Sequence, residues 1–209
     1  MKKIFKKLSP GQIIALGFAV TILLGSLLLI LPCSVNEGVN LRYIDALYTS
    51  TSAVCVTGLI AVDAGDTFTP LGQFFLALLI QIGGLGVTAV GAGIILAVGK
   101  KINIKGRNLI KEAMNLDSGK EVMLFVRDIF VTTITIELLG AFFSFPVFAT
   151  DYSISKAIGL SLFHSVAAFN NSGFDILGNY QNMIPYQDSI WLNLVTCMLI
   201  FLGGIGFLV

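Results

Sequence analysis

The stretches DALYTSTSAVCVTGL, residues 45–59, and FHSVAAFNNSGFD, residues 163–175, decide how this chain folds. Both contain a hydroxyl residue followed by glycine, Thr57-Gly58 and Ser172-Gly173, and a shift of 115 residues places one pair on the other. They lie in regions of intermediate polarity, 41–60 and 156–176, that are neither long nor apolar enough to cross a membrane. These regions are therefore candidates for segments that enter a membrane without crossing it.

Four long apolar segments flank these regions and predict an all-α membrane protein. They are residues 11–31, 70–98, 122–148 and 189–209, each long enough to cross about 30 Å of hydrocarbon. Of the 209 residues, 56% are hydrophobic and only 12% charged, whereas a soluble domain carries about 25% charged residues. This composition excludes a soluble fold, and a net charge of +1 leaves no large basic surface for nucleic acid.

The distribution of charge predicts the orientation. Of the 13 Lys and Arg residues, 11 lie before the first apolar segment or in and beside the linker between the second and third. The positive-inside rule assigns this side to the cytoplasm. The other side has seven acidic and two basic residues, which favours cations near an entrance. We expect a multi-pass protein of the plasma membrane, surrounded by lipid, with a cytoplasmic N-terminus and no nucleic-acid partner.

The similarity between the halves extends beyond the loops and predicts two tandem repeats. Leu24-Gly25 matches Leu139-Gly140 with the same shift of 115, and residues 79–86 match 199–206 with a shift of 120. Each unit would contain an outer helix, a re-entrant pore helix, a filter loop and an inner helix. The first repeat, 1–100, would place these at 11–31, 43–52, 54–58 and 70–98. After a cytoplasmic linker, 101–121, the second repeat, 122–209, would place them at 122–148, 156–168, 169–173 and 189–209.

Loops at membrane depth suit an ion that backbone groups can bind. Unsatisfied amides are costly in lipid, whereas carbonyl oxygens can replace the water shell of K⁺. The C-terminus of a half-helix adds partial negative charge, and glycine permits the turn that directs carbonyls to one axis. Glycines in the inner helices predict close packing, against a pore helix or against another helix. They are Gly83, Gly84, Gly86, Gly203, Gly204 and Gly206.

Two ionisable side chains lie in the apolar or pore segments. Glu137 is a functional candidate by its depth, but its counterpart in the first repeat is Ile22, which favours a local structural or interface role. His164 is more consistent with a packed or hydrogen-bonded side chain than with a proton switch. The three cysteines are widely spaced and odd in number, which indicates neither a disulfide framework nor, with a single histidine, a metal cluster.

The two loops, together with Gln81-Ile-Gly-Gly-Leu-Gly-Val87, resemble the Ktr/Trk/HKT superfamily of potassium transporters, most closely its bacterial KtrB type. The resemblance implies a potassium-channel-like pore of pseudo-fourfold symmetry with one filter glycine per repeat, here Gly58 and Gly173. Glycine in the first loop, rather than serine, points to K⁺ as the transported ion, with Na⁺ as a second candidate and no organic cofactor. The carbonyls that the resemblance implies as ion ligands are those of Cys55, Val56, Thr57, Asn170, Asn171 and Ser172.

The resemblance also implies partners, because members of the superfamily carry four repeats in one chain. We expect this chain to supply half of a K⁺ uptake pore, with its second repeat cut off in the last helix. A missing C-terminal half or another chain would supply the other two repeats. We further expect a homodimer and a cytoplasmic nucleotide-binding regulatory ring. The alternative is a two-repeat cation channel that dimerises to complete its ring, although the filters of two-pore-domain potassium channels contain two glycines each.

A membrane enzyme, such as an intramembrane serine protease using Ser172 and His164, is disfavoured. Asn171-Ser172-Gly173 lacks the first glycine of a Gly-x-Ser-Gly site, and a pair eight residues apart on one segment is poorly placed for base activation. An enzyme would also leave the duplicated Thr57-Gly58 unexplained. We therefore expect no enzymatic activity.

Overall fold

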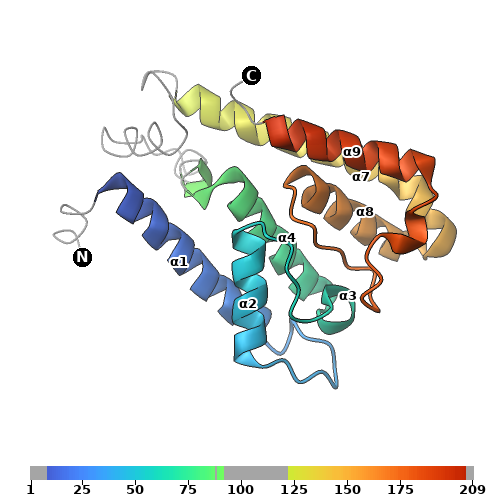
Figure 1. The fold of residues 1–209 in the computed structure, drawn as a ribbon, viewed down its shortest axis with the longest axis horizontal. Coiled ribbons are helices and arrows are strands. Elements are labelled where there is room, and N and C mark those ends of the chain that lie inside the picture. Colours follow the sequence, from blue (N-terminus) through green and yellow to red (C-terminus); the bar gives the residue numbers. More distant parts are fainter. Residues whose placement is uncertain (1–8, 88, 92–121, 206–209) are drawn as a thin grey trace.

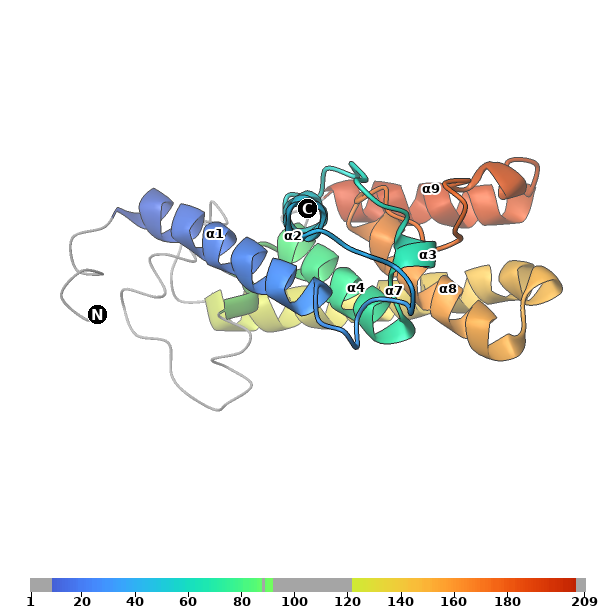
Figure 2. The same ribbon diagram turned by 90° about the horizontal axis from the view of Figure 1, so that it is seen from below.

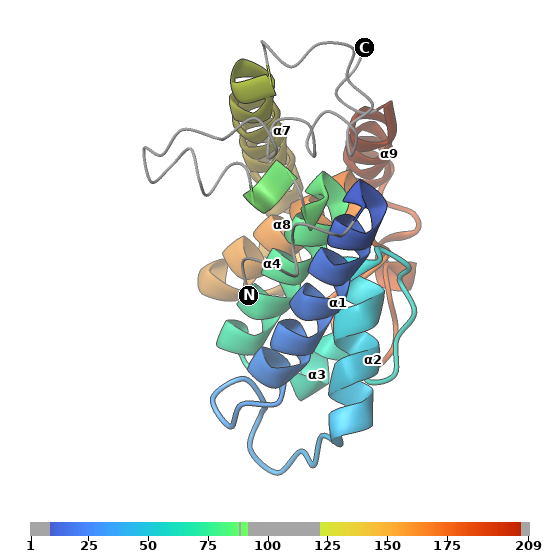
Figure 3. The ribbon, with the colours of Figure 1, turned by 90° about the vertical axis from the view of Figure 1, so that its left-hand side faces the viewer.

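The computed structural model describes residues 9–87, 89–91 and 122–205, and the elements named within these ranges are all helices. The first half contains α1 (Pro10–Leu29), α2 (Tyr43–Val54), the short α3 (Ala64–Thr67) and α4 (Pro70–Leu85). The second half contains α7 (Val122–Asp151), α8 (Ile154–Phe169), the 3₁₀ turn η1 (Ile184–Tyr186) and α9 (Ile190–Ile205). Helices of the first half lie together, and those of the second half lie beside them (Figure 1). Figure 2 and Figure 3 show the same division from two other sides.

Local signals in the sequence set where two of these helices begin. Ser9 Oγ accepts a hydrogen bond from the Gln12 N–H, and Gln12 Oε1 accepts one from the Ser9 N–H, which together form a capping box. Thr69 Oγ1 accepts a hydrogen bond from the Gly72 N–H at the start of α4. In both helices a proline occupies the first position, where its missing N–H costs nothing.

The inner helix of the first half is shorter than the continuous helix that we expected over 70–98. It ends at Leu85 because Gly86 has φ +83°, a left-handed conformation that does not continue a right-handed helix. Residues 92–98 of the expected helix, the expected linker 101–121 and residues 206–209 of the last segment lie outside the described residues.

Two described helices are long and apolar enough to cross a membrane: Gly11–Leu29 and Val126–Asp151. The described parts of α4 and α9 are apolar but only 16 residues long, about 24 Å at the helical rise. Large apolar side chains are exposed along several helices, including Leu24 at 57%, Phe142 at 70% and Phe201 at 63%. Such exposure suits contact with lipid or further protein rather than water.

The two halves are built by equivalent contacts. Ser50 Oγ in α2 donates a hydrogen bond to the Ile22 carbonyl in α1 (2.8 Å), and Ser165 Oγ in α8 donates one to the Glu137 carbonyl in α7 (2.7 Å). Both the donors and the acceptors are 115 residues apart, which is the shift found in the sequence. In each half, therefore, the short helix is hydrogen-bonded to the first helix at the equivalent position.

A shared core joins the halves where α4 packs against α8. Figure 1 shows α4 between α2 and α8, so the inner helix of the first half contacts both short helices. The largest side chains in this core are fully or almost fully buried. They include Leu29, Phe68, Leu76, Ile80, Phe148, Leu160, Phe163 and Leu192.

Candidate functional site

The two Ser/Thr-Gly loops have nearly identical backbone conformations. After α2 and α8, Cys55 (φ −85°, ψ −2°) and Asn170 (φ −79°, ψ 1°) have almost the same dihedrals, close to the bridge region beside the helical one. The next residues turn into the left-handed region, with φ 55° at Val56 and φ 57° at Asn171. This conformation is unusual for a β-branched valine and costs on the order of 1–3 kcal/mol, so the surrounding structure must impose it.

Hydrogen bonds to the preceding helices hold both turns. The Thr57 N–H donates to the Ser52 carbonyl at 2.9 Å, and the Ser172 N–H donates to the Ala167 carbonyl, also at 2.9 Å. The N–H groups of Val56 and Asn171 donate to carbonyls three residues earlier, at 3.2 and 3.0 Å. The loop N–H groups are thus directed back to the helix ends. Six loop carbonyls accept no hydrogen bond from another described residue: those of Cys55, Val56, Thr57, Asn170, Asn171 and Ser172.

The two glycines meet at the ends of these loops. Gly58 has φ +70° and Gly173 has φ +72°, conformations that glycine adopts without steric cost. A Cβ placed on Gly58 would lie 2.6 Å from the Ser172 carbonyl oxygen and 3.4 Å from the Gly173 Cα. The structure therefore brings the two predicted loops together although they are 115 residues apart in sequence.

Glycines of the inner helices lie against the ends of the short helices. A Cβ on Gly83 would overlap the Val54 carbonyl oxygen, and a Cβ on Gly203 would overlap that of Phe169. In both halves, the inner-helix glycine thus lies against the last carbonyl of a short helix. Because each contact joins the backbone of an inner helix to a backbone carbonyl of a short helix, rotation of a side chain cannot make room for a larger residue.

The other inner-helix glycines differ from one another. A Cβ on Gly84 would overlap the Asn170 side chain, whereas the nearest atom to one on Gly204 would be Asn171 Nδ2 at 3.9 Å. At Gly86 an added Cβ would meet no atom of the described residues within 4 Å, and the positive φ of this glycine ends α4. Gly206 lies outside the described residues.

The side chain of Asn170 contacts two helices other than its own. Its Nδ2 lies 3.0 Å from Gln81 Oε1 in α4 and 3.2 Å from Glu137 Oε1 in α7. The position of Glu137 within an apolar segment marked this residue as a candidate in the sequence. Its buried hydrogen bond to Asn170 agrees with a local structural role. The partners could not be found from spacing, because they lie 89 and 33 residues away from Asn170.

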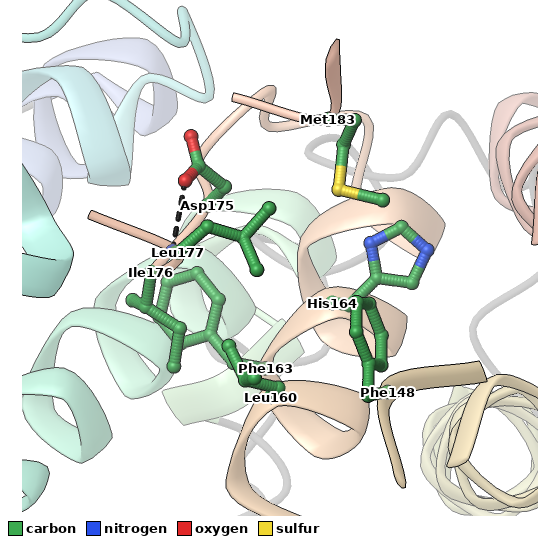
Figure 4. A pocket seen from close by; sticks show the side chains of 8 residues that line it. All are labelled: Phe148, Leu160, Phe163, His164, Asp175, Ile176, Leu177 and Met183. Atoms are coloured by element: carbon green, nitrogen blue, oxygen red, sulfur yellow. Dashed lines mark hydrogen bonds between the residues drawn. The ribbon is translucent and has the colours of Figure 1, made fainter. Parts of the chain in front are cut away.

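His164 is packed and hydrogen-bonded. Its Nε2 lies 2.9 Å from Thr196 Oγ1, and its ring makes an edge contact with Phe148 at 5.7 Å between centroids. Figure 4 shows the Asp175 carboxylate directed away from the imidazole, with its hydrogen bond to the backbone at Leu177. The side chain therefore serves the packing of α8 rather than proton transfer to Asp175.

Two acidic residues at α3 connect the halves: Asp63, which caps this helix, and Asp66 within it. Asp63 Oδ2 accepts a hydrogen bond from the Tyr180 N–H, and Asp66 Oδ2 accepts one from the Asn179 N–H, each at 2.7 Å. Asn179 and Tyr180 belong to the loop in which the repeat shift grows from 115 to 120, and both have positive φ. These carboxylates thus hold the inserted loop of the second half against α3 of the first half.

Replacement of Asp175 by asparagine is expected to stabilise the protein at neutral pH. Burial raises the pKa of the Asp175 carboxyl, and the nearby Asp63 charge adds to the rise, while the hydrogen bond from the Leu177 N–H (3.0 Å) opposes it. Since the folded pKa lies above the unfolded one, ionisation costs stability at higher pH, and the cost disappears as pH falls through the folded pKa. Asparagine keeps the Oδ1 acceptor without the charge.

Thermal unfolding in detergent measures this effect at about pH 7.5 and at about pH 3.5, which lies below the ordinary aspartate pKa of about 3.9. The gain in Tm for Asp175→Asn should be largest at the higher pH and shrink at the lower one. Asp188→Asn, at an exposed position of the outer side, is the control. If the Asp175→Asn protein melts at a lower temperature than the parent at the higher pH, the ionised Asp175 carboxylate does not destabilise the folded protein, and the prediction is wrong.

Comparison with known proteins gives one family and several relatives. The family described as TrkH, cation transport protein, matches residues 12–209. The chain is 39% identical over 208 residues to the "Potassium/sodium uptake protein NtpJ" of Enterococcus hirae, covering 100% of this chain and 46% of that protein. It is 41% identical to "Ktr system potassium uptake protein B" of Bacillus subtilis, covering 97% and 45% respectively. The chain thus spans about half the length of these relatives.

Proposed function

Because this chain belongs to the TrkH family of cation transport proteins, we propose that it supplies two pore repeats of a K⁺ uptake protein of the plasma membrane. The relatives are uptake proteins, so the family is one of transporters and not of enzymes. The resemblance to the Ktr/Trk/HKT superfamily that the loops predicted is thereby confirmed.

The meeting of the two loops at Gly58 and Gly173 is the observation that carries the proposal. Each loop follows the C-terminus of a short helix, where the helix dipole is negative and favours a cation. Carbonyl oxygens that accept no hydrogen bond from described residues are available to replace the water of a dehydrated K⁺. The proposed ligands are the backbone carbonyls of Cys55, Val56, Thr57, Gly58, Asn170, Asn171, Ser172 and Gly173.

Two loops form half of a fourfold ring, so the proposed pore needs two more. We propose that the remaining length of a longer protein, or another chain, supplies them, since the chain spans 46% of the Enterococcus relative. The distribution of Lys and Arg supports a cytoplasmic N-terminus, and the superfamily resemblance supports a homodimer with a cytoplasmic nucleotide-binding ring. K⁺ is the proposed ion, with Na⁺ as the second candidate because the name of the Enterococcus relative includes both.

Rb⁺ uptake in cells that lack their own K⁺ transport tests the half-pore. One strain expresses this chain alone, and a second expresses a chimera in which the chain replaces the matching segment of the Bacillus protein. We expect uptake only from the chimera. Uptake by the chain alone would instead favour the two-repeat channel that dimerises, and a chimera that reaches the membrane without any uptake would contradict the proposal.

A further inference from the structure

We propose that Gln81 and Glu137 are positioning residues that hold the second loop in place through the side chain of Asn170. The inference rests on the proposed function, because it assumes that this loop selects the ion. The three side chains come from three elements: Gln81 from α4, Glu137 from α7 and Asn170 from the residue that ends α8. They connect the second loop to both halves of the protein.

The hydrogen bonds form a closed set. Asn170 Nδ2 lies 3.0 Å from Gln81 Oε1, 3.2 Å from Glu137 Oε1 and 2.9 Å from the Val166 carbonyl, so three acceptors surround one amide group. Gln81 and Glu137 therefore share Asn170 Nδ2 as their donor. Asn170 and Glu137 are each only 8% exposed. Burial makes these bonds costly to break, since no water replaces a lost partner.

The backbone of α4 is shaped to accept Asn170. A Cβ on Gly84 would overlap Asn170 Oδ1, so the amide can occupy this place only if residue 84 is glycine. Among the described residues, Gly204, the counterpart in the second half, has no such neighbour: the closest described atom to a Cβ there would be 3.9 Å away. The close approach is therefore specific to the first inner helix and the second loop.

The surroundings of Gln81, Glu137 and Asn170 are apolar. Gln81 and Glu137 line a groove of about 630 Å³ between α4, α7 and α8, whose other walls include Phe74, Leu78 and Ile134. In such surroundings, a carboxylate is retained only with hydrogen-bond donors to satisfy it. The amide of Asn170 is such a donor, so the position of the Asn170 amide and the presence of Glu137 depend on each other.

The first loop is held in a different way. The counterparts of Asn170 and Glu137 are Cys55, which is exposed, and Ile22, so the polar connection is absent there. Instead, Thr57 Oγ1 lies 3.0 Å from Ser52 Oγ within the same short helix and loop. The first loop thus has a local hydrogen bond, whereas the second depends on residues of α4 and α7.

This difference predicts which substitutions alter ion selection. In the chimera described above, Glu137→Leu should lower the ratio of Rb⁺ to Na⁺ uptake by about tenfold, the scale expected for a hydrogen bond to a charged group. Glu137→Gln keeps an oxygen acceptor for Asn170 and should stay within about twofold of the parent. Gly84→Ala should act like Glu137→Leu, because it displaces the Asn170 amide without altering the carboxylate.

The control is Thr196→Val, which removes a hydrogen bond between α8 and α9 that involves neither Asn170 nor Glu137. A structural role alone would lower the amount of protein in the membrane without changing the uptake ratio, so both are measured. The double variant Glu137→Leu with Asn170→Leu should be no worse than the more impaired single variant.

Equal ratios for Glu137→Leu and Thr196→Val would overturn the inference. A loss in Glu137→Gln as large as in Glu137→Leu would also overturn it, because the charge and not the acceptor would then be required. Gly58→Ser in the same chimera shows whether a negative result concerns only the positioning role of Glu137 or also the proposed function of the loops in ion selection. If that glycine controls the ratio and Glu137 does not, only the positioning role is wrong.

Discussion

Replacement of Gly58 by serine is expected to reduce the preference for Rb⁺ over Na⁺ by on the order of tenfold or more. Residue 58 has φ +70°, and a Cβ there would lie 2.6 Å from the Ser172 carbonyl oxygen, one of the proposed ion ligands. The serine must therefore either move this carbonyl or change its own backbone conformation. Both responses displace oxygens whose positions decide how well they replace the water shell of K⁺.

Gly173→Ser should have the same direction of effect but a smaller size. Its φ of +72° carries the same backbone cost, yet the nearest atom to an added Cβ is the Gly58 Cα at 3.5 Å, an ordinary contact. Uptake of Rb⁺ with and without competing Na⁺ measures both variants in the chimera. The order of the two losses, with Gly58→Ser the more severe, is itself a test of the geometry.

The matched control is Gly38→Ser in an outer loop. Gly38 has φ +83°, but a Cβ there would meet no atom within 4 Å, so this variant carries the backbone cost without the close contact. We expect it to leave the uptake ratio unchanged. Parental ratios in both Gly58→Ser and Gly173→Ser, at normal protein amounts in the membrane, would show that these loops do not select the ion.

The second large effect is expected for Gly203→Ala, which should lower stability by about 3 kcal/mol or more, at the upper end of overpacking costs. The added Cβ would overlap the Phe169 carbonyl oxygen at the end of α8. Since that oxygen belongs to the backbone, α9 and α8 must separate to relieve the overlap. Gly83→Ala should do the same in the first half, where the Val54 carbonyl takes the place of that of Phe169.

Thermal unfolding of this chain in detergent measures the loss. Gly204→Ala is the control, because it introduces the same methyl group one residue later with its nearest neighbour 3.9 Å away. Its Tm should equal or exceed that of the parent, since alanine is the better helix former. A Gly203→Ala protein as stable as Gly204→Ala would refute the close packing of α9 against the end of α8.

Much of the fold follows from patterns that the sequence displays locally. α4 begins at Pro70, where the apolar segment 70–98 begins, and α2 spans Tyr43–Val54 within the region of intermediate polarity, 41–60. The apolar segments and the shift of 115 were readable because membrane helices and repeats leave periodic signals along the chain. The early end of α4 was not readable, since a glycine within an apolar run is compatible with both a continuing and a terminated helix.

The sequence by itself determined the membrane class, the family and the two Ser/Thr-Gly loops, because hydropathy and repetition depend only on the order of residues. Only the tertiary structure decided that Gly58 meets Ser172 and that the Asn170 side chain turns to Gln81 and Glu137. These contacts join residues that are distant along the chain. They depend on how closely two backbones approach, and that distance is set by the packing of α4 against α8 rather than by any local spacing.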